Sequence, residues 1–216
     1  MFQINNGKGK GKEYDYDGKL KFEGEYINGE RNGKGKEYDY NGRLKYEGQY
    51  LNGKRNGKGK LYDNLNGTII YEGEYLNGKI NGKGKIYDRW NGKLGFEGEF
   101  LNGKKNGKGK EYNNGKLGFE GEFLNDKRNG KGKEYDNNGN LKYEGEYLNG
   151  ERNGKIKEYN YDSNLKDEEG ILYKSKTLIG KVFNYFDKFQ FEGENLNEKK
   201  ITKIIMMNLK KKNIKS

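Results

Sequence analysis

The feature that most constrains the fold of this chain is a motif that returns about every 24 residues. The aromatic residue that opens each regular copy stands at Phe22, Tyr46, Tyr71, Phe96, Phe119 and Tyr143, with gaps of 24, 25, 25, 23 and 24 residues. A fixed period of this length is typical of a repeat array, in which each unit packs only against its neighbours. The sequence therefore predicts a repeat protein and not a globular domain around one central core.

The copies become irregular towards both ends of the chain. One degenerate copy precedes the copy that opens at Phe191. Its register is recognisable, because residues 180–191 align with residues 35–46. A terminal repeat must close the open core, so we expect the last copy to act as a cap. The sequence thus divides into five parts. They are a half-repeat cap (residues 1–19), six regular repeats (20–166), a degenerate repeat (167–190), a degenerate capping repeat (191–209) and a basic tail (210–216).

Each regular copy opens with a strand pattern. In residues 20–27, Leu20, Phe22, Gly24 and Tyr26 alternate with residues that are mostly charged. Alternation with a period of two predicts a half-buried β-strand, with the aromatic rings on its inner face and the charges on its outer face. The small Gly24 leaves space on the inner face, so neighbouring rings are expected to pack over bare backbone there.

A turn and a second strand follow the first strand. Asn28 and Gly29 predict a tight turn with positive φ, and Asn32 and Gly33 are expected to close it. Residues 34–38 should then return beside the first strand.

The second strand breaks ideal alternation near its end. Tyr38 is out of phase with the preceding glycines, so we expect a β-bulge near Lys36 and Glu37. This bulge should turn Tyr38 inward and keep Glu37 out of the core. Copies differ in length only in the loop that follows the second strand, so this loop should lie exposed at one edge.

Residues 71–84 read Tyr-Glu-Gly-Glu-Tyr-Leu-Asn-Gly-Lys-Ile-Asn-Gly-Lys-Gly. This motif resembles the MORN (membrane occupation and recognition nexus) repeat. It differs in two positions: Tyr or Phe stands where the family often has Trp, and Asn stands where the family has the His of its His-Gly pair. The spacer Asn-Gly-Lys-Leu is similar to variant repeats of bacterial antitoxin-like proteins. The resemblance implies an all-β fold, in which β-hairpins stack into one elongated, twisted and grooved sheet. At about 4.8 Å per strand, eight hairpins would span about 75 Å.

Two aromatic positions in each regular copy are predicted to form the core and to line a groove. They are Phe22, Tyr26, Tyr46, Tyr50, Tyr71, Tyr75, Phe96, Phe100, Phe119, Phe123, Tyr143 and Tyr147. Their regular recurrence favours a folded array, even though only 30% of the residues are hydrophobic.

The residue types argue against catalysis. The chain has no His and no Cys, which removes thiol chemistry and the common zinc sites. Paired carboxylates such as Glu23 and Glu25 could act as acid and base. Because they recur in most regular copies beside lysines, we interpret them as cross-strand charge pairs of the outer face. We expect neither an enzyme, nor a cofactor, nor a bound metal.

The formal net charge of +11 is concentrated near the C-terminus. Residues 196–216 contribute +6 of it, because seven lysines stand there against Glu198. Such a segment can attract acidic phospholipid or nucleic acid, or can simply be solvated. The candidate lipid contacts are Lys199, Lys200, Lys203, Lys210, Lys211, Lys212 and Lys215.

These patterns favour a non-enzymatic scaffold that binds a protein partner. A peripheral membrane adaptor, held on acidic phospholipid by the basic segment, is the first alternative. Binding of single-stranded nucleic acid ranks below both, because the periodic rings fall at core positions. The array ends could also join copies into a homo-oligomer. With neither an apolar run long enough for a membrane span nor a signal peptide pattern, we expect a cytoplasmic protein, or one at a membrane surface.

Overall fold

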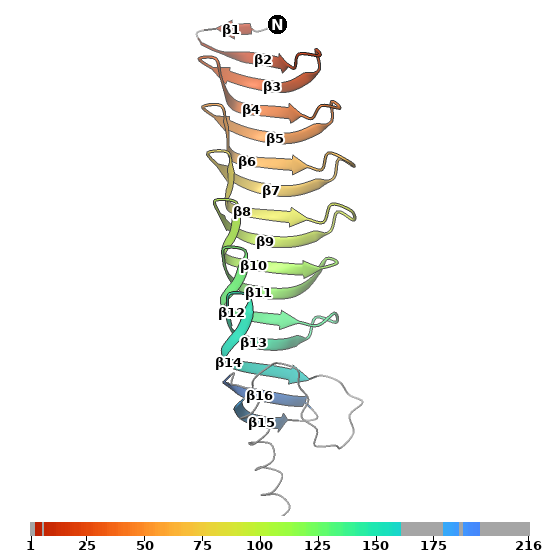
Figure 1. Cartoon of the computed structure of the whole chain (residues 1–216), viewed down its shortest axis with the longest axis vertical. Coiled ribbons are helices and arrows are strands. Elements are labelled where there is room, and N and C mark those ends of the chain that lie inside the picture. Colours follow the sequence, from red (N-terminus) through yellow and green to blue (C-terminus); the bar gives the residue numbers. More distant parts are fainter. Residues whose placement is uncertain (1–2, 6, 161–178, 186–187, 195–216) are drawn as a thin grey trace, which may run out of the picture. The chain divides into compact units, whose positions relative to one another are not determined.

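The computed structural model describes residues 3–5, 7–160, 179–185 and 188–194, which form sixteen β-strands (Figure 1). Within these residues the strands pair antiparallel and are joined by turns and loops, so the predicted all-β hairpin array is confirmed. The chain divides into two structural units. The first comprises residues 1–116 with 124–126, and the second comprises residues 117–123 with 127–216.

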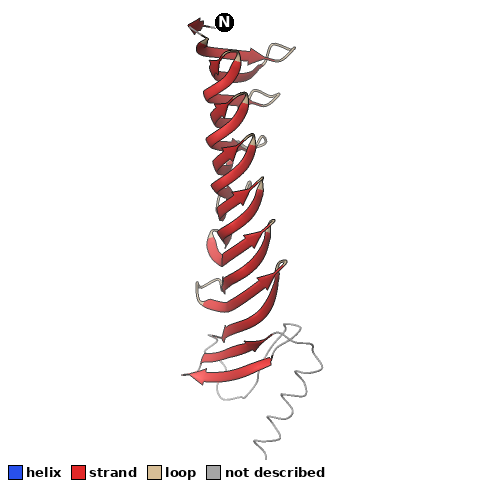
Figure 2. Cartoon of the chain, turned by 90° about the vertical axis from the view of Figure 1, so that its left-hand side faces the viewer, coloured by secondary structure: helices blue, strands red, loops and turns tan. Residues whose placement is uncertain are grey.

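The strands of the first unit pair in chain order, each with the next. Figure 2 shows that successive strands of this unit rotate relative to one another, as twisted sheets do. The strands are β1 (Gln3–Asn5), β2 (Lys8–Tyr14), β3 (Leu20–Ile27), β4 (Glu30–Tyr38), β5 (Leu44–Leu51), β6 (Lys54–Tyr62), β7 (Ile69–Leu76), β8 (Lys79–Tyr87), β9 (Leu94–Leu101) and β10 (Lys104–Asn113).

The second unit contains most of β11 and the five strands that follow it. These strands are β11 (Lys116–Leu124), β12 (Lys127–Tyr135), β13 (Leu141–Leu148), β14 (Glu151–Asn160), β15 (Ile179–Tyr185) and β16 (Lys188–Glu194). Here β16, and not β15, pairs with β14. The pairs from Lys155 to Glu158 match those from Lys34 to Glu37 in the β4–β5 ladder, but the bulge that follows Glu37 has no counterpart after Glu158. The opening strand of the last copy therefore lies directly beside β14, and the sheet departs from chain order. Residues 167–178 of the degenerate copy lie outside the described residues.

The hairpin turns have the predicted backbone conformation. Asn28 and Gly29 have φ values of 52° and 82°, as a type I′ turn requires. Asn32 and Gly33, however, do not close this turn, because β4 already begins at Glu30. Gly33, with a φ of 86°, lies instead in an irregularity of the β3–β4 ladder. The ladder resumes at Gly35, so β4 continues through this irregularity.

Glycines leave room for the aromatic core, as predicted. Gly24, Gly35 and Gly48 lie opposite one another on β3, β4 and β5. A Cβ atom added to Gly35 would lie 2.4 Å from the Cζ atom of Phe22, which is closer than atoms can approach. The ring of Phe22 therefore needs bare backbone at this position.

The aromatic rings form a continuous core within each unit. The side chains at all twelve positions named above are buried, with exposed fractions between 0 and 6%. In β3 to β9, the opening ring of each copy meets the second ring of the next copy edge to face, at centroid distances of 5.1 to 5.7 Å. Such pairs add about 0.5–1.5 kcal/mol beyond the burial of their area. The rings therefore couple each copy to its neighbour.

The expected orientation of Glu37 and Tyr38 was wrong. A bulge is present, because the β4–β5 ladder shifts its register between these residues. Yet Glu37 lies on the ring face, and the Tyr38 hydroxyl donates a hydrogen bond of 2.7 Å to Glu23 on the other face. The physical reason is that Glu37 finds partners on the ring face, Tyr50 and Arg55, which offset the cost of its burial.

Candidate binding surface

A layer of cations covers the rings on the inner face. The guanidinium of Arg31 lies 4.1 Å from the ring centroid of Phe22, and Arg55 lies 4.1 Å from that of Tyr46. In the second unit Arg152 lies 3.9 Å from the ring centroid of Tyr143. The twelve rings therefore form the core beneath this face and are not the surface that a partner would touch.

Carboxylates hold these cations in place. Glu37 accepts hydrogen bonds from the Tyr50 hydroxyl at 2.7 Å and from Arg55 at 2.5 and 3.2 Å. Burial raises the pKa of Glu37, but the bonds from Arg55 and Tyr50 outweigh it, so the pKa lies below its ordinary value. Glu134 of the second unit is bound by Tyr147 and Arg152 in the same way. The charged groups of this layer at Glu37 and Glu134 therefore find their hydrogen-bond partners within the protein.

The ion-pair layer is interrupted in the middle of the first unit. Leu61 stands opposite Tyr71, at the position where Glu37 stands opposite Tyr46. Ile80 stands opposite Tyr75, at the position where Arg55 stands opposite Tyr50. The Tyr75 hydroxyl is consequently buried without a hydrogen-bond partner. Burial raises its pKa to about 12. The central copies thus replace ionic contacts with apolar ones.

The paired carboxylates of the outer face have structural roles. Glu23 lies opposite Lys36, and it accepts the Tyr38 hydroxyl and contacts Lys12 at 3.4 Å. Glu25 accepts the backbone N–H of Lys34 at 3.1 Å beside the irregularity in β4. Among the described residues no cluster of three or more carboxylates is arranged to hold a metal ion. Both glutamates are therefore occupied by the fold.

The loops between copies are shaped by aspartate side chains. Asp39 Oδ1 accepts the N–H groups of Asn41 at 2.9 Å and Arg43 at 2.8 Å. Asp15, Asp63, Asp88 and Asp136 open their loops with the same kind of bond. Such Asx turns fix the loop backbone from within. These turns use only the backbone N–H groups of the residues that follow the aspartate, so they do not depend on the side chains at the next two positions.

Four large side chains stand exposed on these loops in the first unit. Their exposed fractions are 98% for Tyr16, 71% for Tyr40, 61% for Leu65 and 73% for Trp90. We call these four residues the loop row. Each follows the first aspartate of its loop by one or two positions. The corresponding loops at residues 113–115 and 136–140 carry only Asn, Asp and Gly, so among the inter-copy loops that the structure describes the row comprises the first four.

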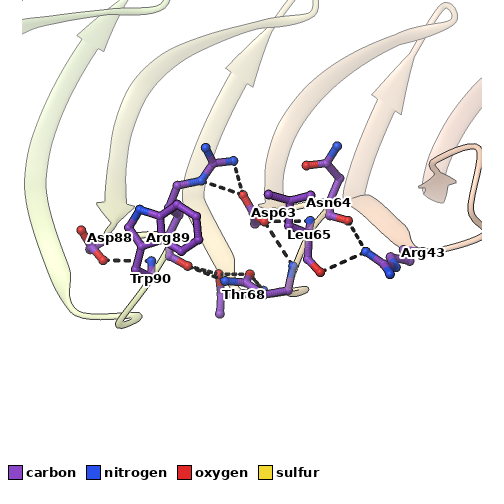
Figure 3. Close-up of polar contacts among 9 residues, drawn as sticks. Arg43, Asp63, Asn64, Leu65, Thr68, Asp88, Arg89 and Trp90 are labelled. Carbon is purple, nitrogen blue, oxygen red and sulfur yellow. Dashed lines mark hydrogen bonds and ion pairs between the residues drawn. The ribbon is translucent and has the colours of Figure 1, made fainter.

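Polar side chains fix each loop to the next one, as Figure 3 shows for the middle of the series. Lys19 Nζ donates to the carbonyl oxygen of Tyr40 at 3.1 Å, and Arg43 donates to that of Leu65 at 3.0 Å. The Thr68 hydroxyl donates to the carbonyl oxygen of Arg89 at 3.1 Å. The preceding loop thus holds the backbone of Tyr40, of Leu65 and of Arg89, which stands beside Trp90.

An ion pair adds to this connection at the third and fourth loops. The guanidinium of Arg89 donates two hydrogen bonds to Asp63 Oδ2, one of them 2.9 Å long (Figure 3). These bonds, with the backbone N–H of Leu65, lower the pKa of the buried Asp63 carboxyl. The same guanidinium lies 5.5 Å from the ring centroid of Trp90. The Trp90 loop is therefore attached both by its backbone and by its neighbouring side chain.

The sequence pattern did not single out the loop row. Its members differ in type and fall outside the periodic part of the motif, so alignment of the copies discards them. The signal that could have found them is a large apolar residue in a loop otherwise made of Asn, Asp and Gly. The predicted lipid contacts, Lys199 to Lys215, lie outside the described residues.

No helix in the described ranges is long and apolar enough to cross a bilayer. A search among curated proteins finds none that matches the chain. The model of the MORN repeat matches six segments, which together make up more than half of the 216 residues. They are residues 22–42, 46–64, 71–93, 96–116, 119–141 and 143–155. With this coverage, and with the hairpins that the structure shows at these positions, the chain belongs to the MORN-repeat family.

Proposed function

We propose that this MORN-repeat protein is a non-enzymatic platform that binds a protein partner along the loop row. The observation that carries the proposal is the exposure of Tyr16, Tyr40, Leu65 and Trp90 on four successive loops. Tyr and Trp are enriched at protein interfaces, where a few such side chains supply most of the binding energy.

The way in which the loops of the row are held in place supports the same proposal. Its loops are fixed internally by Asx turns and externally by the bonds from Lys19, Arg43 and Thr68. A surface held in this way loses little conformational entropy when a partner binds. On the inner and outer faces, by contrast, many charged side chains pair with one another within the protein. Glu37 pairs with Arg55 on the inner face, and Glu23 pairs with Lys12 on the outer face.

Partner capture from cells that contain the protein tests this function. The wild-type chain is compared with a Tyr40→Ser/Trp90→Ser variant and with a Leu51→Ser/Leu76→Ser control. The control positions are exposed to 48% and 51% but lie at the hairpin-turn edge. We expect a partner that the wild type and the control retain and that the loop-row variant loses at least tenfold. Equal retention by all three chains would contradict the proposal.

A further inference from the structure

We propose that the loop row binds a proline-rich segment of its partner in the polyproline II conformation. This inference rests on the proposed function and names the chemical class of the partner. It starts from the spacing of the row, because the four side chains stand on loops that recur with the array.

The spacing of the loops favours polyproline II over other peptide conformations. Successive loops are two strands apart, which is a step of about 9.6 Å along the direction of the inter-strand hydrogen bonds. One turn of polyproline II contains three residues and rises about 9.3 Å, so every third side chain faces the same way at nearly the same interval. Seven residues of an α-helix rise about 10.5 Å, so its mismatch over three intervals reaches about 3 Å. A β-strand repeats one face about every 6.7 Å and fits less well.

The side chains of the row suit this backbone. Polyproline II has no internal hydrogen bonds, so its carbonyl oxygens need donors, and its pyrrolidine rings pack on aromatic faces. Tyr16 and Tyr40 offer hydroxyl groups, and Trp90 offers an indole N–H. Leu65 adds an aliphatic contact between the second and fourth positions. Known receptors for such segments use grooves lined by aromatic residues in the same manner.

The charge of the loops fits a neutral partner. Loops 15–19, 39–43, 63–68 and 88–93 together contain four basic and five acidic residues. Their near balance gives little attraction for a nucleic acid or a strongly acidic peptide, both of which depend on net positive charge. The chain itself contains no proline, so no segment of its own competes for the row.

The protein provides its own reporter for a direct test. Trp90 is the only tryptophan in the chain and belongs to the row, so its fluorescence responds to occupation of this surface. The probe is a synthetic peptide of Pro-Pro-Leu triplets, about 12 residues long so that it spans about four turns. A peptide of Gly-Gly-Leu triplets of equal length keeps the leucine spacing without the polyproline II preference.

We expect a saturable change in Trp90 fluorescence with the Pro-Pro-Leu peptide, and at least tenfold weaker binding of the Gly-Gly-Leu peptide. Tyr40→Ala should weaken binding of the Pro-Pro-Leu peptide about tenfold. Arg43→Ala should weaken it several-fold, because the carbonyl of Leu65 loses its donor. The control Leu76→Ala, at the other edge, should bind as the wild type does. Circular dichroism confirms that each variant remains folded.

Three results would overturn the inference: no fluorescence change with the Pro-Pro-Leu peptide, equal binding of both peptides, or unchanged binding by Tyr40→Ala. If the peptide fails while the loop-row variant still loses a cellular partner, the polyproline II assignment is wrong and the protein-binding function stands. If the Pro-Pro-Leu peptide binds with the expected dependence on Tyr40, the inference is supported whatever partner the cells provide.

Discussion

The two edges of the hairpin sheet in the first unit are built in different ways. At the hairpin-turn edge, a backbone bond joins successive copies, as when the N–H of Gly78 donates to the carbonyl of Arg55 at 2.8 Å. A recurring Asn adds a second bond there, as when Asn56 Oδ1 accepts the N–H of Asn77 at 3.3 Å. At the loop edge, side chains make the connection, as when Arg43 donates to the carbonyl of Leu65. Backbone bonds require only a conformation, whereas side-chain bonds require particular residues.

This difference explains where the copies resemble one another and where they do not. The turn edge repeats Asn-Gly with φ values of 50–52° at Asn28, Asn52, Asn77 and Asn102. The loop edge changes in length and presents Tyr, Leu or Trp at neighbouring positions. A position that the fold does not use can vary, and a varied, exposed aromatic surface is suited to recognition. The comparison therefore separates architecture from function.

The largest expected effect tests buried rings against exposed rings. Tyr71→Ala removes a ring that is 2% exposed, and it should lower the free energy of unfolding by about 3–5 kcal/mol. Trp90→Ala removes a larger side chain from the loop edge, where the change should stay within about 0.5 kcal/mol. Chemical denaturation measures both. Comparable losses would mean that the loop row belongs to the core.

The next effect tests the turn edge. Gly78 has a φ of 84°, which side chains other than glycine adopt at a cost of about 1–2 kcal/mol. Gly78→Ala should therefore lower the unfolding free energy by that amount. Leu76→Ala at the same edge is the control and should cost less, because half of its side chain is already exposed. A neutral Gly78→Ala variant would show that the turn conformation is not what keeps this edge uniform.

A smaller effect distinguishes two copies of the same tyrosine position. Tyr50→Phe removes a hydroxyl that donates to Glu37 and should cost about 0.5–1.5 kcal/mol. Tyr75→Phe removes a buried hydroxyl without a partner, so it should leave stability unchanged or raise it. Thermal denaturation of the two variants gives the comparison. If both variants lose the same stability, Tyr75 has an acceptor in solution that its position in the structure does not show.

The same carboxylate sets the direction of a pH effect. The pKa of Glu37 is lowered in the folded protein, so its contribution is complete above its ordinary value of 4.5 and is lost as the pH falls below it. A Glu37→Leu/Arg55→Ile variant copies the residues of the central copies, Leu61 and Ile80. Denaturation midpoints measured from neutral to acidic pH should fall less steeply for this variant than for the wild type. If the midpoints of the variant and the wild type fall equally steeply with pH, Glu37 does not cause the loss of stability in acid.

The smallest expected effect concerns the bonds between loops. Arg43→Ala removes an exposed donor to two carbonyl oxygens and should change the unfolding free energy by about 0.5 kcal/mol or less. Hydrogen exchange of the loop at residues 63–68 should nevertheless become faster, since its attachment to the preceding loop is lost. Unchanged exchange there would show that the Asx turn at Asp63 alone holds the loop.

Sequence and structure agree where a local rule decides the outcome. The period, the strand alternation and the Asn-Gly turns follow from residue type and spacing, so the hairpin array and its positive-φ turns could be predicted. The two aromatic positions of each regular copy fall on one strand face for the same reason, and the structure buries their rings. These features depend on neighbours within a few residues, which the sequence displays directly.

The tertiary structure decided what depends on contacts between copies. Glu37 faces the rings because Arg55, 18 residues later, and Tyr50, 13 residues later, are there to bind it. The loop row forms because stacking places loops of separate copies at one edge and bonds such as Lys19 to Tyr40, 21 residues apart, hold them there. Sequence alone determined the unit and its turns. Only the packing of one unit on the next determined which polar groups are paired and which aromatic side chains remain exposed.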